Sequence, residues 1–276
     1  MRRYNSLILK GLAGLFWLLE AGCAPGFGSG VPSAAPEPEL IGACSPLPCI
    51  RASIGAVPEL PSDLSPALRE LVERDVQAAL YAPINSEDAQ STKDVLMAEL
   101  QVRYDEGTQP GMSDTLGDWE ITRSATLLFQ NADVLSLDIH SEGFLGGAHG
   151  FSERRLMTFD VKSGKRLTIA DLISPNSRAI FERLVETEFR RAREVPAKES
   201  LSQAGFFVKP GEPIAVPDNF GITPGGLVIH YNPYEIAPYV FGATEIVVPM
   251  EAFRGVLSDD LKSIVASLGA TAPKAL

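Results

Sequence analysis

The sequence of 276 residues is short of cysteine, of basic residues and of long apolar runs. Three cysteines are too few for a small domain built on disulfides. The 24 basic side chains are outnumbered by 35 acidic ones, and the net charge of −11 argues against sequence-independent nucleic-acid binding. Away from the N-terminus, no uncharged apolar run reaches the ~18 residues of a membrane-spanning helix, which argues against a polytopic membrane protein. The hydrophobic content of 45% is nevertheless enough for a packed core.

Motifs that carry chemistry are also scarce. The sequence has no GxSxG nucleophile motif, no Walker-type phosphate loop and no HExxH zinc motif. One route to a catalytic or metal site remains. It requires Asp138 to converge with the three histidines, which are His140, His149 and His230. We predict no catalytic residue, no metal site and no cofactor. Whether the protein is an enzyme stays open, and the absence of catalysis is favoured.

The first 22 residues have the organisation of a bacterial export signal. Basic residues precede an apolar run from Gly11 to Leu19, which is too short to span a bilayer. The small residues and the cysteine that follow resemble a lipobox, although Glu20 stands where that signal prefers leucine. The resemblance implies that Cys23 is acylated and becomes the mature N-terminus. Two alternatives are a secretory signal cut near Ala24 and an uncleaved anchor.

Residues 23–47 are interpreted as the anchor cysteine and a flexible tether, because Gly, Pro, Ser and Ala dominate the segment. Cys44 and Cys49 lie near its end. An exported chain meets an oxidising compartment, so we predict a Cys44–Cys49 disulfide. Free thiols and half of a zinc site are the alternatives. The expected location is a membrane-anchored lipoprotein that faces the periplasm or the cell exterior.

The rest of the chain reads as an α+β fold with antiparallel sheets and packed helices. Ser65 and Pro66 predict the start of a helix that continues to about Leu80. Further helices are predicted over 91–105, 176–193 and 258–268, with one short helical turn after Thr168. Strands are predicted over 50–57, 119–130, 134–144, 153–161, 206–208, 219–223, 226–231 and 244–248. The strands from 119 to about 169 should form an antiparallel meander.

Three stretches resemble the extracytoplasmic domain of RsiV-like anti-sigma factors and of the N-terminal half of PdaC-like peptidoglycan deacetylases. They are residues 146–150, 158–173 and 226–253. The resemblance implies a smaller N-terminal module over 48–125, a larger C-terminal module over 126–270, and a role in extracytoplasmic binding or sensing. Some relatives bind lysozyme. The sigma-binding segment and the deacetylase domain have no counterpart in this sequence, so those two activities are not expected.

Two loops carry the candidate ligand-binding residues. Gly146, Gly147 and His149 belong to the sequence GGAHG, where glycines would let a partner approach closely. Tyr234 and Tyr239 belong to NPYEIAPY, where aromatic rings could anchor an interface. The structural alternatives are a tight turn that needs positive φ at the glycines, and a loop whose aromatic rings pack onto the core.

These observations predict a lipid-anchored binding or sensing protein of the cell envelope without catalysis. The expected partners are a basic envelope protein such as a lysozyme, or a peptidoglycan component; the membrane is contacted through the lipid, and nucleic acid is not expected. Removal of the leader takes away more basic than acidic residues, so the exported chain is more acidic than the whole. The alternatives are a hydrolase or accessory factor acting on peptidoglycan, and a purely structural lipoprotein.

Overall fold

A computed structural model describes residues 39–41, 49–84, 91–109 and 119–262. The chain divides into two compact units, Met1–Ala34 and Ala35–Leu276, and every described residue belongs to the second. Its helices are α1 (Pro66–Leu80), α2 (Lys93–Gly107), α3 (Ile169–Leu172), α4 (Arg178–Ala192) and α5 (Met250–Arg254), with 3-10 turns at Pro175–Ser177, Tyr239–Phe241 and Asp259–Leu261. Within these residues, no helix has the length and apolar character needed to cross a bilayer.

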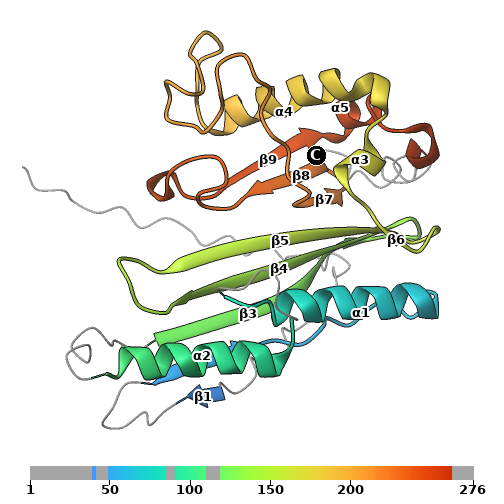
Figure 1. The fold of residues 1–276 in the computed structure, drawn as a ribbon. Helices are drawn as coiled ribbons and strands as arrows, with labels where there is room; N and C mark the ends of the chain where they lie inside the picture. Colours follow the sequence, from blue (N-terminus) through green and yellow to red (C-terminus); the bar gives the residue numbers. More distant parts are fainter. Residues whose placement is uncertain (1–38, 42–48, 85–90, 110–118, 263–276) are drawn as a thin grey trace, which may run out of the picture. The chain divides into compact units, whose positions relative to one another are not determined.

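The larger sheet follows the chain in strand order (Figure 1). Its strands are β1 (Glu39–Ile41), β2 (Ile50–Ile54), β3 (Trp119–Gln130), β4 (Val134–Phe144), β5 (Phe151–Asp160) and β6 (Lys165–Arg166). Neighbouring strands are antiparallel except β2 and β3, which are parallel. The predicted meander is confirmed. The parallel pair was not foreseen, because the two helices that connect its strands gave no indication of where β2 would pair.

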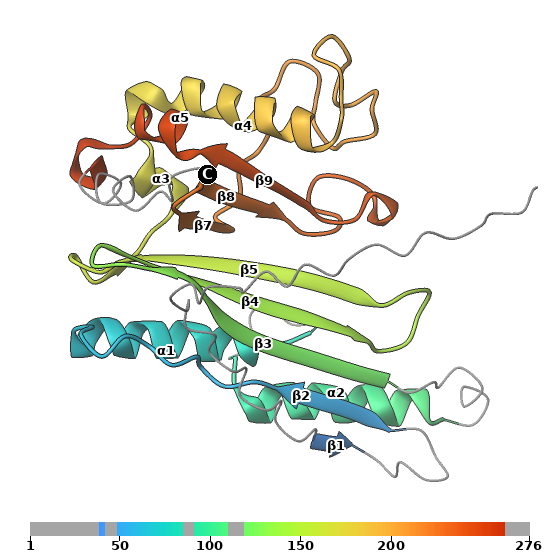
Figure 2. The ribbon, with the colours of Figure 1, turned by 180° about the vertical axis from the view of Figure 1, so that it is seen from behind.

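Two helices cover one face of this sheet (Figure 2). The Ser65 hydroxyl accepts a hydrogen bond from the backbone of Leu68, so α1 begins as predicted, with Pro66 in its first turn. The apolar side of α1 packs on odd-numbered residues of β4 and β5, and that of α2 packs on β2 and the start of β3. This alternation follows from the period of two in a strand.

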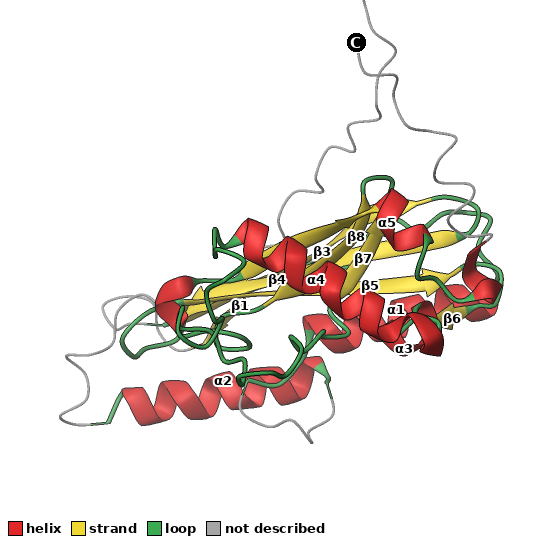
Figure 3. Ribbon diagram, turned by 90° about the horizontal axis from the view of Figure 1, so that it is seen from above, coloured by secondary structure: helices red, strands yellow, loops and turns green. Residues whose placement is uncertain are grey.

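The smaller sheet has the order β7 (Phe220–Thr223), β8 (Gly226–Tyr231) and β9 (Thr244–Pro249). Helix α4 lies across it (Figure 3) and buries Phe181, Val185 and Phe189 against it. Two antiparallel-rich sheets with packed helices confirm the α+β class.

Side chains between the two sheets bond to backbone N–H and C=O groups at strand edges that have no strand partner. Ser136 Oγ of β4 both donates to Ile222 O and accepts from Ile222 N, at the side of β7 that does not pair with β8. In return, Asn219 accepts from Leu156 N and donates to Arg154 O on the outer side of β5. Buried backbone groups need such partners, so these bonds fix one sheet against the other.

Several predicted boundaries differ from the structure. β1 lies inside the segment predicted to be a tether and pairs with β2. β3 runs through residue 125, where one module was expected to end. No strand forms at 206–208, because these residues bond and pack as a loop, including Phe207 N to Ile236 O. The helix predicted over 258–268 is a 3-10 turn at Asp259–Leu261, and residues from 263 onward lie outside the described residues.

Candidate functional site

The structure brings together the aromatic and histidine residues of the two candidate loops. One loop joins β4 to β5 and carries His149; the other joins β8 to β9 and carries Tyr234 and Tyr239. The rings of His149 and Tyr239 are stacked, with centroids 3.6 Å apart and planes 14° apart. The Tyr234 hydroxyl lies 3.5 Å from His149 Nε2, and the Tyr234 and Tyr239 rings are 5.6 Å apart. We call these three residues the aromatic cluster.

Backbone bonds hold the aromatic cluster in place. His149 Nδ1 lies 2.7 Å from Gly150 O, and the Tyr239 hydroxyl donates to the same oxygen at 2.8 Å. A ring nitrogen beside a carbonyl oxygen has to carry the proton, so Nδ1 is the protonated nitrogen and Nε2 of a neutral ring is free to accept. The Tyr234 hydroxyl faces that acceptor.

The two glycines have conformational roles. Gly146 and Gly147 have φ values of 86° and 94°, a region that favours glycine. A Cβ on Gly146 would lie only 2.7 Å from the Trp119 ring, whereas a Cβ on Gly147 would meet nothing within 4 Å. The turn alternative therefore accounts for both glycines, and close packing adds a second reason at Gly146.

Tyr234 stands out in a different way. It has a φ of 71°, which is costly for a residue with a large side chain, and the residue is 59% exposed. Backbone strain at an exposed aromatic residue is common where a surface has a binding role. Tyr234 is not packed onto the core, whereas Phe241 of the same loop is.

Exposed apolar side chains also lie on the loop that carries Tyr234 and Tyr239 and on the loop bonded to it. Among the described residues six large hydrophobic side chains are exposed, and three of them, Phe207, Tyr234 and Val240, are on two loops joined by the bond from Phe207 N to Ile236 O. Their exposed fractions are 60%, 59% and 85%. We call these three residues the apolar tip. Contiguous exposed apolar groups are typical of interaction surfaces.

A rigid base carries the apolar tip. The Arg193 guanidinium at the end of α4 lies 5.6 Å from the Phe206 ring centroid and 5.7 Å from that of Phe241. It also donates to Phe241 O at 2.8 Å. The Phe206 and Phe241 rings pack edge to face. The two loops are therefore fixed to α4 and to each other, which lowers the entropy that a partner would have to remove on binding.

An ionic network lies on the strands that flank the two candidate loops. Arg154 of β5 binds both oxygens of Asp138 through Nε at 2.9 Å and also pairs with Glu245 of β9. His230 Nδ1 is 3.7 Å from Glu245 Oε2, too far for a hydrogen bond. The His230 ring and then Arg154 hold the pKa of Glu245 below its usual range, although burial acts in the opposite direction. Hydrogen bonding to Asp138 raises the pKa of Arg154.

The predicted polar residues thus separate into two groups. Asp138 and His230 belong to the ionic network, where Arg154 neutralises the carboxylate of Asp138. His149 belongs to the aromatic cluster, and His140 bonds Ser152. In the part of the chain that the structure describes, no three His, Cys, Asp or Glu side chains form a group able to hold a metal ion. Cys49 is buried, while Cys23 and Cys44 lie outside the described residues.

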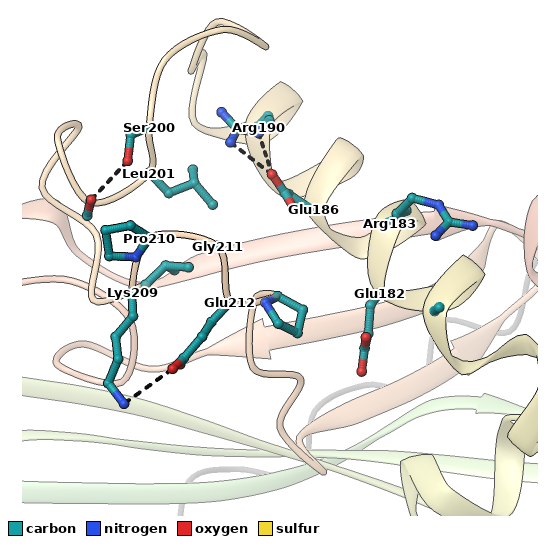
Figure 4. A pocket seen from close by; sticks show the side chains of 14 residues that line it. Glu182, Arg183, Glu186, Arg190, Ser200, Leu201, Lys209, Pro210, Gly211 and Glu212 are labelled. Atoms are coloured by element: carbon teal, nitrogen blue, oxygen red, sulfur yellow. Dashed lines mark hydrogen bonds and ion pairs between the residues drawn. The ribbon is translucent and has the colours of Figure 1, made fainter.

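A separate groove runs between α4 and the loop 200–213 (Figure 4), with a volume of about 560 Å³. Its walls carry three acidic and three basic side chains together with two serines. None of the residues of the aromatic cluster or the apolar tip lines it.

Comparison with known proteins gives a family match over part of the chain and two similar folds. Residues 170–251 match DUF3298, a protein family of unknown function. A DUF3298 family member from Bacteroides fragilis NCTC 9343 superposes with a TM-score of 0.64 at 19% identity, over 85% of this chain and 95% of its own. A DUF3298 family protein from Pseudomonas aeruginosa PAO1 gives 0.58 at 19% identity, over 83% and 97%. No curated protein matches the chain.

At this identity the likeness to the DUF3298 structures shows a shared fold and nothing about activity. The DUF3298 match includes the loop with Tyr234 and Tyr239 but not His149. It does not test the resemblance to RsiV-like and PdaC-like proteins, which stays a prediction. Sequence reasoning did not single out Phe207, Val240 or Arg154. For Phe207 and Val240, the one available signal was that an apolar residue lies within a loop.

Proposed function

We propose that the protein is a non-catalytic binding protein of the cell envelope that recognises a basic protein partner, such as a lysozyme, through the aromatic cluster and the apolar tip. The observation that carries the proposal is the exposed, strained Tyr234 beside His149 and Tyr239. Tyrosine is enriched among the residues that dominate binding energy at interfaces. The site is fixed before binding by Arg193 and by bonds to Gly150.

Charge supports a basic partner. The chain has a net charge of −11, and the exposed Glu235 directly follows Tyr234. Such a distribution speeds association with a cationic protein and disfavours an anionic one. Glycan of the cell wall is the other partner that the aromatic rings would fit, and it is an outcome of the test below. Asp138 is paired with Arg154, and His149 is stacked on Tyr239, so no observation among the described residues favours the hydrolase alternative.

The test is a calorimetric titration of the full chain with lysozyme at low ionic strength. We expect Tyr234→Ala to weaken binding by about tenfold or more. Val102→Ala, which removes an equally exposed apolar side chain from α2, should leave binding unchanged. If lysozyme does not bind but peptidoglycan fragments do, and Tyr234→Ala abolishes that binding, the site is retained and the partner is wrong. If neither binds, the proposed function is wrong.

The envelope location forms part of the proposal. We propose that Cys23 carries the lipid that holds the protein at the membrane and that Cys44 and Cys49 form a disulfide. Labelling of growing cells with a radioactive fatty acid should mark the protein, and Cys23→Ser should abolish the label. Mass spectrometry of the unreduced, alkylated protein should find Cys44 and Cys49 in one linked peptide. Alkylation of both cysteines without reduction would contradict the disulfide.

A further inference from the structure

A small cavity lies where α1 ends over the larger sheet. Its volume is about 120 Å³, and its polar lining includes Arg123 of β3, Ser141 of β4, and Glu153 and Arg155 of β5. Sites for drug-sized molecules have volumes of roughly 300–1,000 Å³. The cavity therefore has room for a small ion or for one functional group of a larger molecule.

The register of the sheet places these four polar side chains on one face. Arg123 lies opposite Ser141, and Ser141 lies opposite Glu153. Arg155 is two residues further along β5, so it points to the same side. The residues that follow on this face of β4 and β5 are apolar and pack against α1, which ends at Leu80. The polar side chains thus occupy the part of the face that α1 does not cover.

Arg123 is only 6% exposed, and its hydrogen bonds leave one nitrogen unused. Nη1 donates to Leu80 O at 2.9 Å and to Ala82 O at 2.6 Å, and Nε donates to Ser141 Oγ at 3.2 Å. Within the described part of the chain, Nη2 has no hydrogen bond, and it is not among the polar atoms enclosed there without a partner. Nη2 is therefore open to the cavity. Since Ser141 Oγ accepts from Nε, its own O–H is also left to donate.

The guanidinium of Arg123 has no carboxylate partner among the described residues. Burial lowers the pKa of Arg123, and the charge of Glu153 opposes this effect without cancelling it. A buried charge is costly unless it is paired. The carbonyl groups at the end of α1 supply part of the missing negative charge. A role limited to capping α1 is therefore the alternative, and it is an outcome of the test below.

The other charges of the lining leave one positive charge unbalanced. Arg154 is paired with two carboxylates that lie outside the cavity. Arg155 is exposed, and neither it nor Glu153 forms a side-chain hydrogen bond or ion pair within the residues that the structure describes. Arg123 and Arg155 thus stand against Glu153 alone. A ligand with a single negative charge restores the balance.

We propose that this cavity binds a carboxylate group, with Nη2 of Arg123, the hydroxyl of Ser141 and the guanidinium of Arg155 as its donors. A carboxylate has two acceptor oxygens and one negative charge, which match these donors and the unbalanced charge. Hydrogen bonds between charged groups are stronger than neutral ones. The site uses no residue of the aromatic cluster or the apolar tip, so it and the proposed function can succeed or fail separately.

The experiment is a titration of the full chain with acetate at neutral pH, followed by the NMR signals of Arg123 Nε–H and of the Arg155 side chain. We expect saturable shifts with acetate and none with acetamide, which has a similar shape and no charge. Arg155→Gln and Ser141→Ala should each weaken acetate binding by about tenfold. N-acetylalanine distinguishes two sources of the carboxylate, because tighter binding than acetate assigns the end of a peptide and weaker binding assigns a small free acid.

Arg191→Gln is the matched control, because Arg191 is an exposed arginine of α4 that does not line the cavity. It removes the same charge and should leave acetate binding unchanged. Arg123→Gln tests Nη2 directly, and Arg155→Gln with Ser141→Ala decides the question if that variant does not fold. The proposal is overturned by the absence of saturable shifts up to about 100 mM acetate, by equal shifts with sodium chloride, or by unchanged binding in both variants. Arg123 would then serve only to cap α1.

Discussion

At the scale of single residues, the same loop holds positions fixed by packing and positions left open to solvent. Gly146 lies against the Trp119 ring, while its neighbour Gly147 has a similar φ and open space around it. Tyr234 has a positive φ and exposes its ring, although no close contact in the core requires a tyrosine there. Neighbouring residues in such loops therefore differ in what a substitution would cost.

The two glycines give a matched prediction for stability. Gly147→Ala should lower the free energy of unfolding by about 1–2 kcal/mol, the usual cost of positive φ with a Cβ. Gly146→Ala should lower it by about 1–3 kcal/mol more, because its methyl group would also meet the Trp119 ring 2.7 Å away. Urea denaturation of both variants measures the difference. Equal losses would show that Trp119 moves aside without cost.

The lowered pKa of Glu245 predicts part of the sensitivity of the folded protein to acid. Its folded pKa is below the ordinary value of 4.5, so it stabilises the fold above that pH and ceases to do so as the pH falls through the folded pKa. Glu245→Gln should be less stable than the wild type at pH 7, and the difference should shrink as the pH is lowered below about 4.5. Thermal unfolding at a series of pH values tests this, and a constant difference would contradict it.

At the scale of elements, side chains replace the missing strand at two sheet edges. The outer side of β5 is bonded by Asn219 and Asn232, and the outer side of β7 by Ser136 and Thr158. An unpaired edge would be open to pairing with another chain. The amides and hydroxyls close these edges with groups that also join the two sheets.

Removal of the amide at Asn219 should show its role. Asn219→Ala leaves Leu156 N and Arg154 O without their present partners and should cost about 1–3 kcal/mol of unfolding free energy. Asn176→Ala, which changes an exposed asparagine ahead of α4, should change it by less than about 0.5 kcal/mol. Amide hydrogen exchange at Leu156 should speed up only in the first variant. Unchanged exchange there would show that the Asn219 amide does not protect Leu156 N–H.

At the scale of the whole described unit, the two sheets should unfold together. The bonds of Ser136 and Thr158 join β7 to the larger sheet, and Gly221 of β7 lies so close to that sheet that a Cβ there would come within 2.5 Å of the Leu128 side chain. Arg154 adds an ionic link to β9. With this many links in a buried interface, partial separation would leave backbone groups unpaired.

Ser136→Ala tests that link. It should lower the unfolding free energy by about 1–3 kcal/mol, because Ile222 N and O both lose their partner. Ser124→Ala, on the exposed side of β3, is the control and should change it by less than about 0.5 kcal/mol. Circular dichroism and tryptophan fluorescence should give one coincident transition for the wild type. Two separated transitions in the wild type would contradict a single cooperative unit.

Local patterns in the sequence determined most of the elements. Ser65 with Pro66 fixed the start of α1, the alternation of 119–160 fixed three strands, and Thr168 with Asp171 fixed the turn at α3. These features depend on bonds and periodicities within a few residues, which a sequence displays directly. The candidate loops could be chosen from composition for the same reason.

Only the tertiary structure decided which of these segments meet. His149 and Tyr239 are 90 residues apart in sequence and are stacked in space, because Gly150 O and the bonds along β5 bring their loops to one place. The parallel pairing of β2 with β3, the edge bonds of Asn219 and the charged groove also come from contacts between distant segments. A sequence carries no local signal for such contacts, since they depend on how complete surfaces pack. Composition determined that the chain is acidic and has enough apolar residues for a core. Packing determined where the exposed Tyr234 and the charged groove beside α4 lie.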